Sequence, residues 1–436
     1  MQVSAPRYFA ALDWMAAGIA VLLAMLVYVI TLAPTVTLEY SGALVVAAEH
    51  LGVARPPGYP VWTLLAKGFI CLFPFAEYQG HPNPAWAVNL MSAAFGALAC
   101  GLLALLTCRL SRENVPGHFR YINALCATTG ITAALLFAFS PAMWSQSVIA
   151  ETHTLTNVYF LGLLALSLRW MSLRDNKTPY LLAFLAGLGL AISPMLILFL
   201  PIILVTASFV SKIDFARMTA AALLFCGFLF SELIWGPVRA GFANGVLAIA
   251  ILVATLLLAL LLVAFRPLRP VGLLLLLLLA GLIPYIYLPL ASDHNPPMNM
   301  GYARTWEGFW HVIMRGQYEA LAPLNPFAEP MAFFRDLAWY FRLTAAQFTA
   351  PIVALALVPA LALPWMTRKA QPALILVFAA LGIFAVVVLI GANPQPDVQN
   401  TVIGRVIFIP SFALLALLAG LGFNYLLIMG TTRWAK

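Results

Sequence analysis

Two carboxylates and a rigid turn lie between the first two long apolar runs of the chain. The segment 31–67 carries Glu39 and Glu49, then passes Arg55 into the turn PPGYP, Pro56 to Pro60. A carboxylate held at a desolvated edge can acquire the raised pKa that a general base requires. A solvated loop acid is the alternative for either side chain. Because the rest of the chain is mostly apolar, we expect any chemistry to be located here.

The apolar runs around this segment define the class of protein. Of 436 residues, 63% are hydrophobic and 9% are charged, whereas soluble domains carry about a quarter charged residues. In lipid, an α-helix satisfies all of its backbone hydrogen bonds within itself and so needs no closed barrel. The sequence therefore predicts an all-α polytopic membrane protein, a single integral membrane domain over 1–436. We expect about twelve transmembrane helices, near 14–33, 88–108, 121–140, 155–171, 180–193, 195–210, 218–237, 244–265, 271–290, 349–366, 371–391 and 406–429.

The distribution of charge gives the orientation. With the N-terminus in the cytoplasm, the cytoplasmic connections hold 15 of the 23 Lys and Arg residues but only 4 of the 15 Asp and Glu residues. This asymmetry is the positive-inside pattern. It predicts an integral protein of a bacterial inner membrane, with both termini cytoplasmic and the active face periplasmic. The net charge of +8 then anchors topology, and no nucleic-acid partner is expected.

The outer connections are longer and carry acids, aromatic residues and prolines. The first outer loop, 34–88, holds the candidate catalytic segment and a short apolar helix near 61–75, expected at the interface or as a re-entrant helix. The loop 291–348 contains two amphipathic stretches, 304–320 and 330–348. An apolar face beside a charged stripe predicts amphipathic juxtamembrane helices in these outer loops.

Several motifs occur in a fixed order along the chain. They are APTVT (33–37), SG (41–42), LGV (51–53), PPGYP (56–60), AWAVNLMSAAFGAL (85–98), SQSVIAETHTLTN (145–157), YIYLPLASDHNPPMNMG (285–301), RGQY (315–318) and IPSF (409–412). This set resembles the GT-C membrane glycosyltransferases. Within them it is most similar to the protein O-mannosyltransferase-like group that includes transmembrane protein 260, and the motifs span most of the chain.

The chain departs from the family pattern in the first loop. Where the family reads roughly Asp-Ser-Gly-Glu, this chain reads Tyr40-Ser41-Gly42-Ala43. Arg55 replaces a usual His before Pro-Pro, and Ser193-Pro194 stands where a His-containing turn is expected. Two interpretations remain open. Glu39, one position early, has taken over the carboxylate role, which we favour, or this member is altered in activity or substrate.

The resemblance implies a reaction and a set of site residues. A sugar, with a mannose-like hexose favoured, would pass from a polyprenyl-phosphate donor to an acceptor hydroxyl of a protein Ser/Thr or a glycan. Inverting transfer needs a base, for which the candidates are Glu39, Glu49 and Glu151. Cations that stabilise the departing phosphate, or that snorkel at the interface instead, are Arg55, Lys67, Arg315 and Arg405. Substrate-lining candidates are Tyr40, Ser41, Pro57, Tyr59, His153, Asn157, Asp293, His294, Tyr318 and Asp397.

Other functions stay open. No cofactor is assigned; a divalent metal would need His and acid side chains from distant segments to converge, which the spacing does not predict. A transporter or lipid-linked-sugar flippase would suit twelve spans, although its ionisable groups would be expected near the bilayer midplane. A catalytically altered relative would bind lipid or partners without turnover. The expected partners are the lipid-linked donor, a protein or glycan acceptor and membrane lipid.

Overall fold

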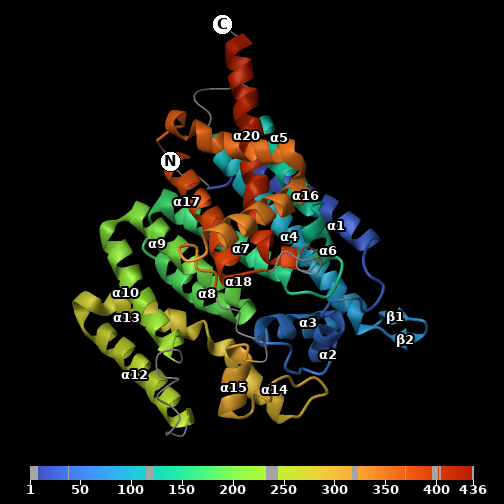
Figure 1. Cartoon of the computed structure of the whole chain (residues 1–436), viewed down its shortest axis with the longest axis vertical. Coiled ribbons are helices and arrows are strands. Elements are labelled where there is room, and N and C mark those ends of the chain that lie inside the picture. The colour runs from blue at the N-terminus through green and yellow to red at the C-terminus, as the bar shows by residue number, and fades with distance from the viewer. Residues whose placement is uncertain are drawn as a thin grey trace, which may run out of the picture. The chain divides into compact units, whose positions relative to one another are not determined.

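The computed structural model describes residues 8–37, 39–113, 122–231, 244–316, 323–368, 370–394, 401 and 404–434. Its described residues are helical apart from loops and one short antiparallel hairpin, β1 (Glu77–Tyr78) with β2 (His81–Pro82) (Figure 1). The chain divides into two compact units. Unit 1 comprises 1–34, 89–165 and 321–436, and unit 2 comprises 35–88 and 166–320.

Unit 1 is a bundle of long apolar helices. It contains α1 (Ala11–Ile30), α4 (Pro84–Glu113), α5 (Ile122–Ala138), α6 (Pro141–Ser147), α7 (His153–Leu173), α16 (Pro330–Ala362), η5 (Leu363–Trp365), α17 (Ala370–Gly382), η6 (Ile383–Val387), α18 (Val388–Ala392), η7 (Gly404–Phe408) and α20 (Ile409–Trp434), with α4 and α7 continuing into unit 2. Helix α20 packs on α16 and α5. The Tyr340 hydroxyl donates to Ser411 Oγ at 2.9 Å, and its ring contacts buried Phe408 and Phe412.

A buried ion pair joins the beginning of α1 to the end of α4. Two guanidinium nitrogens of Arg112 lie 2.6 and 2.9 Å from the two carboxylate oxygens of Asp13, which is fully buried. The Ala10 amide also donates to Asp13 at 2.8 Å. This bidentate geometry satisfies the buried carboxylate and fixes how the two helix ends meet.

Helix α16 breaks where the sequence predicted a boundary. Its backbone leaves the helical region at Thr349 (φ 61°), two residues before Pro351. A proline removes a helical hydrogen bond and clashes with the preceding turn. The predicted helix 330–348 and the predicted span that begins at 349 are therefore both helical and separated by a kink.

Unit 2 is built from shorter helices. They are α2 (Ser41–Glu49), α3 (Pro60–Leu72), α8 (Thr178–Ile192), η1 (Pro194–Leu198), α9 (Phe199–Val210), α10 (Lys212–Leu229), α12 (Asn244–Ala264), η3 (Arg266–Leu268), α13 (Arg269–Ala280), η4 (Ile283–Ile286), α14 (Tyr287–Asp293) and α15 (Trp306–Ile313). Helix α13 lies beside α8, α10 and α12 (Figure 1). A Cβ at Gly187 would collide with the Leu278 carbonyl, so glycine permits the close approach of α8 and α13.

The described segments predicted as spans are largely helical, but not all are long enough to cross a bilayer. Among the described residues, six helices are long and apolar enough to cross a bilayer: 11–30, 84–113, 266–293, 330–365, 370–392 and 404–429. The pair α5 and α6, bent by 72°, would be a seventh. Helix α8 has 15 residues, about 22 Å at about 1.5 Å per residue, against a core of about 30 Å. The fold is that of an all-α polytopic membrane protein, and the count of about twelve spans is not confirmed.

Two predicted outer helices differ in extent from the prediction. The apolar stretch near 61–75 forms the 13-residue helix α3. Within the described part of the stretch 304–320, residues 304–316, the helix is α15, which ends at Ile313 shortly before the left-handed backbone of Arg315 (φ 58°).

Candidate functional site

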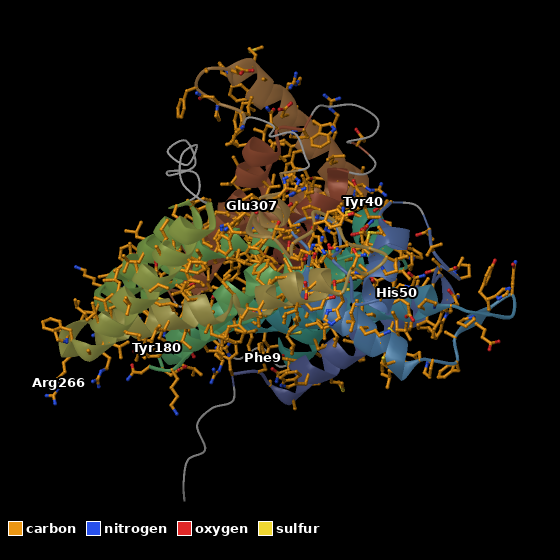
Figure 2. The ribbon with its side chains drawn as sticks, turned by 90° about the horizontal axis from the view of Figure 1, so that it is seen from below. Phe9, Tyr40, His50, Tyr180, Arg266 and Glu307 are labelled. Atoms are coloured by element: carbon orange, nitrogen blue, oxygen red, sulfur yellow. The ribbon has the colours of Figure 1, made fainter. Side chains whose placement is uncertain are left out.

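The first candidate carboxylate lies at the turn into α2. Glu39 has a left-handed backbone (φ 67°), and its side chain is exposed. Tyr40 follows at the N-terminal boundary of α2, and His50 stands at the other end of this helix (Figure 2). The Glu39 side chain is therefore exposed in the folded chain. The sequence had left open either a desolvated carboxylate or a solvated loop acid at this position.

Two tyrosine rings hold Arg55. The guanidinium carbon lies 4.1 Å from the centre of the Tyr40 ring and 5.7 Å from that of Tyr59. A cation over an aromatic face at these distances is attracted by the ring quadrupole. Tyr40 and Arg55 are two of the three first-loop positions, with Ala43, at which the chain departs from the family pattern, and they contact each other.

The PPGYP turn positions the Arg55 and Tyr59 side chains. The Pro56–Pro57 bond is cis, Gly58 has φ 92°, and Tyr59 has φ 43° just before Pro60 begins α3. Pro57 is buried. A positive φ at Gly58 carries no Cβ penalty, and a Cβ there would also collide with Leu288. The turn therefore sets the direction of the chain on both sides of Tyr59.

Glu49 and Lys67 form a pair of their own. Lys67 Nζ lies 3.7 Å from Glu49 Oε2 and donates to the Glu49 carbonyl at 2.7 Å. Both side chains are half-buried, so the pair ties the end of α2 to α3. Nearby Ser41 is fully buried, and its hydroxyl has no hydrogen-bond partner among the described residues. Glu49 and Lys67 are thus committed to each other, which weighs against separate roles as base and phosphate ligand.

A distant motif docks on this loop. The Val53 amide donates to the Met298 carbonyl at 2.9 Å, and the Met300 amide donates to the Val53 carbonyl at 3.1 Å. The Tyr287 hydroxyl donates to the Gly52 carbonyl at 2.9 Å. A Cβ at Gly52 would overlap the Met298 carbonyl. Beneath lies an apolar cluster of Val53, Leu288, Ala291, Ala303 and Val312.

The sequence did not predict this docking, although its signals were present. LGV and PPMNMG were noted as separate motifs, and a glycine between larger residues marks a close backbone approach. Asp293 and His294, in the docked segment, are exposed, and the His294 ring pairs with the Leu290 carbonyl of its own helix at 2.8 Å. Arg315 is exposed in unit 2. Tyr318 lies outside the described residues.

The remaining acid is buried in unit 1. Glu151 is 1% exposed and lies two residues before the start of α7 at His153. The Thr152 amide donates to its Oε2 at 3.2 Å, and the Glu151 amide donates to Ser92 Oγ at 3.4 Å. The positive end of the α7 dipole also favours this carboxylate.

Two further predicted residues follow in α7. The Asn157 side-chain amide donates to the His153 carbonyl at 2.8 Å, and His153 is half-buried. Together with Glu151 they form a buried polar cluster at the junction of α4 and α7, rather than an open surface. The role of Ser92 there was not predicted, although it lies in the quoted AWAVNLMSAAFGAL motif.

Arg405 lies in η7, directly before α20, and is half-buried. Its Nε is buried and has no hydrogen-bond acceptor among the described residues. Asp397 lies outside them. Within the described residues there is no group of three or more His, Cys, Asp and Glu side chains that could hold a metal ion.

Known proteins are similar to the part of the chain that carries these motifs. A family model described as the Protein O-mannosyl-transferase TMEM260 N-terminal domain matches residues 41–216. The Protein O-mannosyl-transferase TMEM260 of Mus musculus is 35% identical over 178 residues, which cover 40% of this chain and 23% of that protein. The resemblance to the TMEM260-like O-mannosyltransferase family is confirmed.

A second TMEM260-like relative agrees. The Protein O-mannosyl-transferase tmem260 of Dictyostelium discoideum is 27% identical over 186 residues, covering 40% of this chain and 21% of that protein. The chain thus spans less than a quarter of the length of the TMEM260-like relatives that it matches. The matched segment includes Glu49, Arg55 and Glu151 and begins two residues after Glu39.

Proposed function

We propose that this protein is a glycosyltransferase that moves a mannose-like hexose from a polyprenyl-phosphate donor to an acceptor hydroxyl. The acceptor is a Ser or Thr of a protein, or a glycan. One observation carries the proposal: family motifs far apart in the sequence, LGV, PPGYP and 285–301, fold into one local structure around Arg55. The two similar proteins are also named as protein O-mannosyl-transferases.

Glu39 is the proposed base. Glu49 is paired with Lys67, and Glu151 is 1% exposed and bound at the start of α7. Glu39 is exposed at the turn before α2, where an acceptor can approach it. A substrate that covers the site would remove water from this carboxylate and strengthen its interaction with the acceptor hydroxyl.

The proposed reaction is a displacement at the anomeric carbon of the sugar. The acceptor oxygen bonds to the anomeric carbon while its proton passes to the Glu39 carboxylate. The bond between the anomeric carbon and the phosphate oxygen breaks, and the polyprenyl phosphate leaves with the electron pair. Arg55, held by Tyr40 and Tyr59, is the proposed ligand of the leaving phosphate, and a guanidinium suits phosphate geometry. Arg405 and Arg315 are the further candidate cations. The buried Nε of Arg405 could donate a hydrogen bond to a phosphate oxygen.

The proposed setting follows the charge pattern. The protein would lie in a bacterial inner membrane with both termini in the cytoplasm and the site on the periplasmic face. The outer loops 34–88 and 291–348 would then supply the substrate-lining residues.

A catalytically altered member is the second candidate. The observation that favours it is the contact between Tyr40 and Arg55, because both residues differ from the family pattern. In this case the loop would bind the lipid phosphate through Arg55 without transferring the sugar.

Transfer in proteoliposomes distinguishes these functions. The full chain would be reconstituted with radiolabelled polyprenyl-phosphate mannose and a Ser/Thr-rich peptide. Labelled peptide supports the proposed function. Saturable donor binding without labelled peptide supports the altered member, and donor crossing the bilayer without product supports a flippase.

A further inference from the structure

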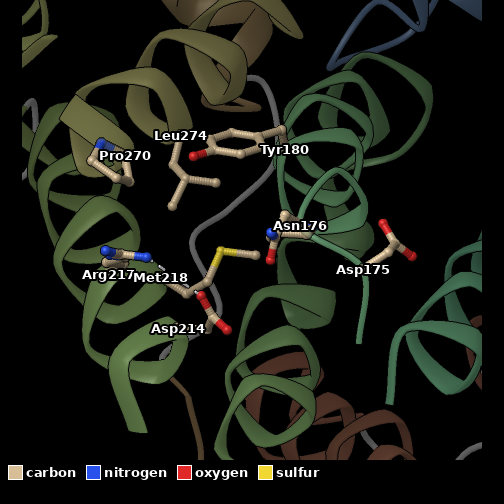
Figure 3. A pocket seen from close by; sticks show the side chains of 9 residues that line it. Asp175, Asn176, Tyr180, Asp214, Arg217, Met218, Pro270 and Leu274 are labelled. Carbon is tan, nitrogen blue, oxygen red and sulfur yellow. Dashed lines mark ion pairs between the residues drawn. The ribbon is translucent and has the colours of Figure 1, made fainter. Parts of the chain in front are cut away.

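A polar cavity of about 280 Å³ lies in unit 2, away from the loop around Arg55. Its wall is formed by the connection before α8 and by the first turns of α8, α10 and α13 (Figure 3). The charge pattern assigns the connections that precede α8, α10 and α13 to one side of the membrane, the cytoplasmic side. The cavity is at the small end of the range of ligand pockets, which is the size of a headgroup rather than of a whole lipid.

The cavity presents both signs of charge. Arg217 Nη1 lies 3.8 Å from Asp214 Oδ1, which is longer than a hydrogen bond, and both side chains are partly exposed. Asn176 and Tyr180 also line the cavity (Figure 3). Among the described residues, neither the Asn176 amide nor the Tyr180 hydroxyl has a hydrogen-bond partner. A ligand can therefore find donors and acceptors here that the protein leaves available.

The second acid in the wall is already used by the protein. Asp175 accepts hydrogen bonds from the Thr178 amide at 2.8 Å, from the Thr178 hydroxyl and from the Lys177 amide at 3.1 Å. Burial raises the pKa of Asp175, but these hydrogen bonds outweigh it and lower the pKa below its usual value. Asp175 is a cap of α8. Asp214 also accepts a hydrogen bond from the Ser211 hydroxyl, through Oδ2 at 2.7 Å, so the Asp214 Oδ1 and the Arg217 guanidinium are the charged groups that a ligand would meet.

A narrow apolar crevice of about 10 Å³ adjoins the cavity along the same helices. Met218 lines both, and the crevice is otherwise lined by small or aliphatic side chains, including Ala183, Ala186, Ala222 and Leu278. In α10 the wall residues 214, 218 and 222 recur every four positions, as do 270, 274 and 278 in α13. This spacing places each set on one helix face. The crevice is too small for an acyl chain, so only the polar group of a ligand would enter the cavity.

We propose that this cavity binds the headgroup of a glycerophospholipid that carries a primary amine, a phosphoethanolamine headgroup, with its acyl chains outside the cavity. The phosphate would lie against Arg217, Tyr180 and the N-terminal ends of α10 and α13, whose dipoles favour an anion. The ammonium would donate to Asp214 and to the Asn176 carbonyl. A quaternary amine would instead call for an aromatic cage, and an anionic headgroup without an amine leaves Asp214 unmatched.

The test is lipid binding to the purified, delipidated full chain, measured by native mass spectrometry. The probes are phosphatidylethanolamine, phosphatidylcholine and phosphatidylglycerol with the same acyl chains, and soluble phosphoethanolamine. We expect phosphatidylethanolamine to bind about tenfold or more tightly than the other two lipids, the scale of one charged hydrogen bond. Arg217→Gln should weaken all three lipids, and Asp214→Asn should abolish the preference for the amine.

Matched variants separate this site from general effects of charge and folding. Lys212→Gln changes charge near the cavity but does not line it, so its binding should equal that of the wild type. Arg217 is partly exposed, so Arg217→Gln should melt as the wild type does. Equal binding of the three lipids by the wild type, or unchanged binding in both Arg217→Gln and Asp214→Asn, would overturn the proposal. Binding of the soluble headgroup without binding of the lipid would also overturn it.

Discussion

The contact between Arg55 and Tyr40 can be measured as a coupling free energy. The guanidinium carbon lies 4.1 Å from the Tyr40 ring centre, and Tyr40 is 41% exposed. A cation–π contact contributes about 0.5–1 kcal/mol at exposed sites and about 2 kcal/mol when desolvated. Arg55 is half-buried and has the Tyr59 ring at 5.7 Å as a second neighbour. We therefore expect a coupling of about 1 kcal/mol, a factor of about five in the unfolding equilibrium.

The assay is a double-mutant cycle on reversible unfolding of the full chain in mixed micelles. The single variants Tyr40→Leu and Arg55→Gln and their combination give the coupling as the departure from additivity. Tyr40→Phe is the matched control, because it keeps the ring and removes only the hydroxyl, so most of the coupling should remain. Coupling below about 0.3 kcal/mol, the usual error of additivity, would refute the reasoning that the ring holds Arg55.

Three further predictions concern the frame of the two units. Arg112→Ala should reduce the free energy of unfolding by about 3–5 kcal/mol, because it leaves the fully buried Asp13 carboxylate without its cation; a loss below about 1 kcal/mol, typical of surface pairs, would contradict this. Gly52→Ala should expose the segment 285–301 to hydrogen exchange, since its Cβ overlaps a carbonyl of that segment, whereas Gly42→Ala, with open space around it, should leave exchange unchanged or slowed. The lowered pKa of Asp175 means that its stabilisation is complete above the unfolded pKa of about 3.9 and is lost as the pH falls through the folded pKa. The stability difference between wild type and Asp175→Asn should therefore shrink on acidification, and a difference that grows would contradict the sign.

The helices could be predicted from the sequence because apolar runs and prolines determine them locally. The break of α16 at Thr349 follows from Pro351 and from the change from mixed to apolar composition. The end of α15 was missed, because the left-handed backbone of Arg315 is a property of the folded loop that spacing does not encode. The number of spans stays unconfirmed for a similar reason. An apolar run shows that a segment is buried in lipid or protein, and a 15-residue helix such as α8 can be buried by its neighbours.

The sequence offered candidate site residues one by one, but it did not predict their pairings. Glu49 and Lys67 were expected to act separately. They are 18 positions apart in the sequence and lie on two different helices, so the spacing within a single helix could not predict their contact. The same holds for Tyr40 and Arg55, which approach each other from the two sides of α2. Such contacts depend on how a turn directs the chain, and the PPGYP motif indicates that a turn exists without giving its direction.

The central claim, that Glu39 is the base of a sugar transfer, is tested most directly by the transfer rate of Glu39→Gln. The substitution keeps size and hydrogen bonding but removes the proton acceptor, and loss of a general base costs about 10²–10⁴ in rate. Glu77→Gln is the matched control, because Glu77 is another exposed acid of unit 2, in the hairpin strand β1. With polyprenyl-phosphate mannose as donor, we predict that Glu77→Gln transfers at the wild-type rate and that Glu39→Gln falls by about a hundredfold or more, with donor binding retained. A Glu39→Gln protein that transfers at the wild-type rate would contradict the claim.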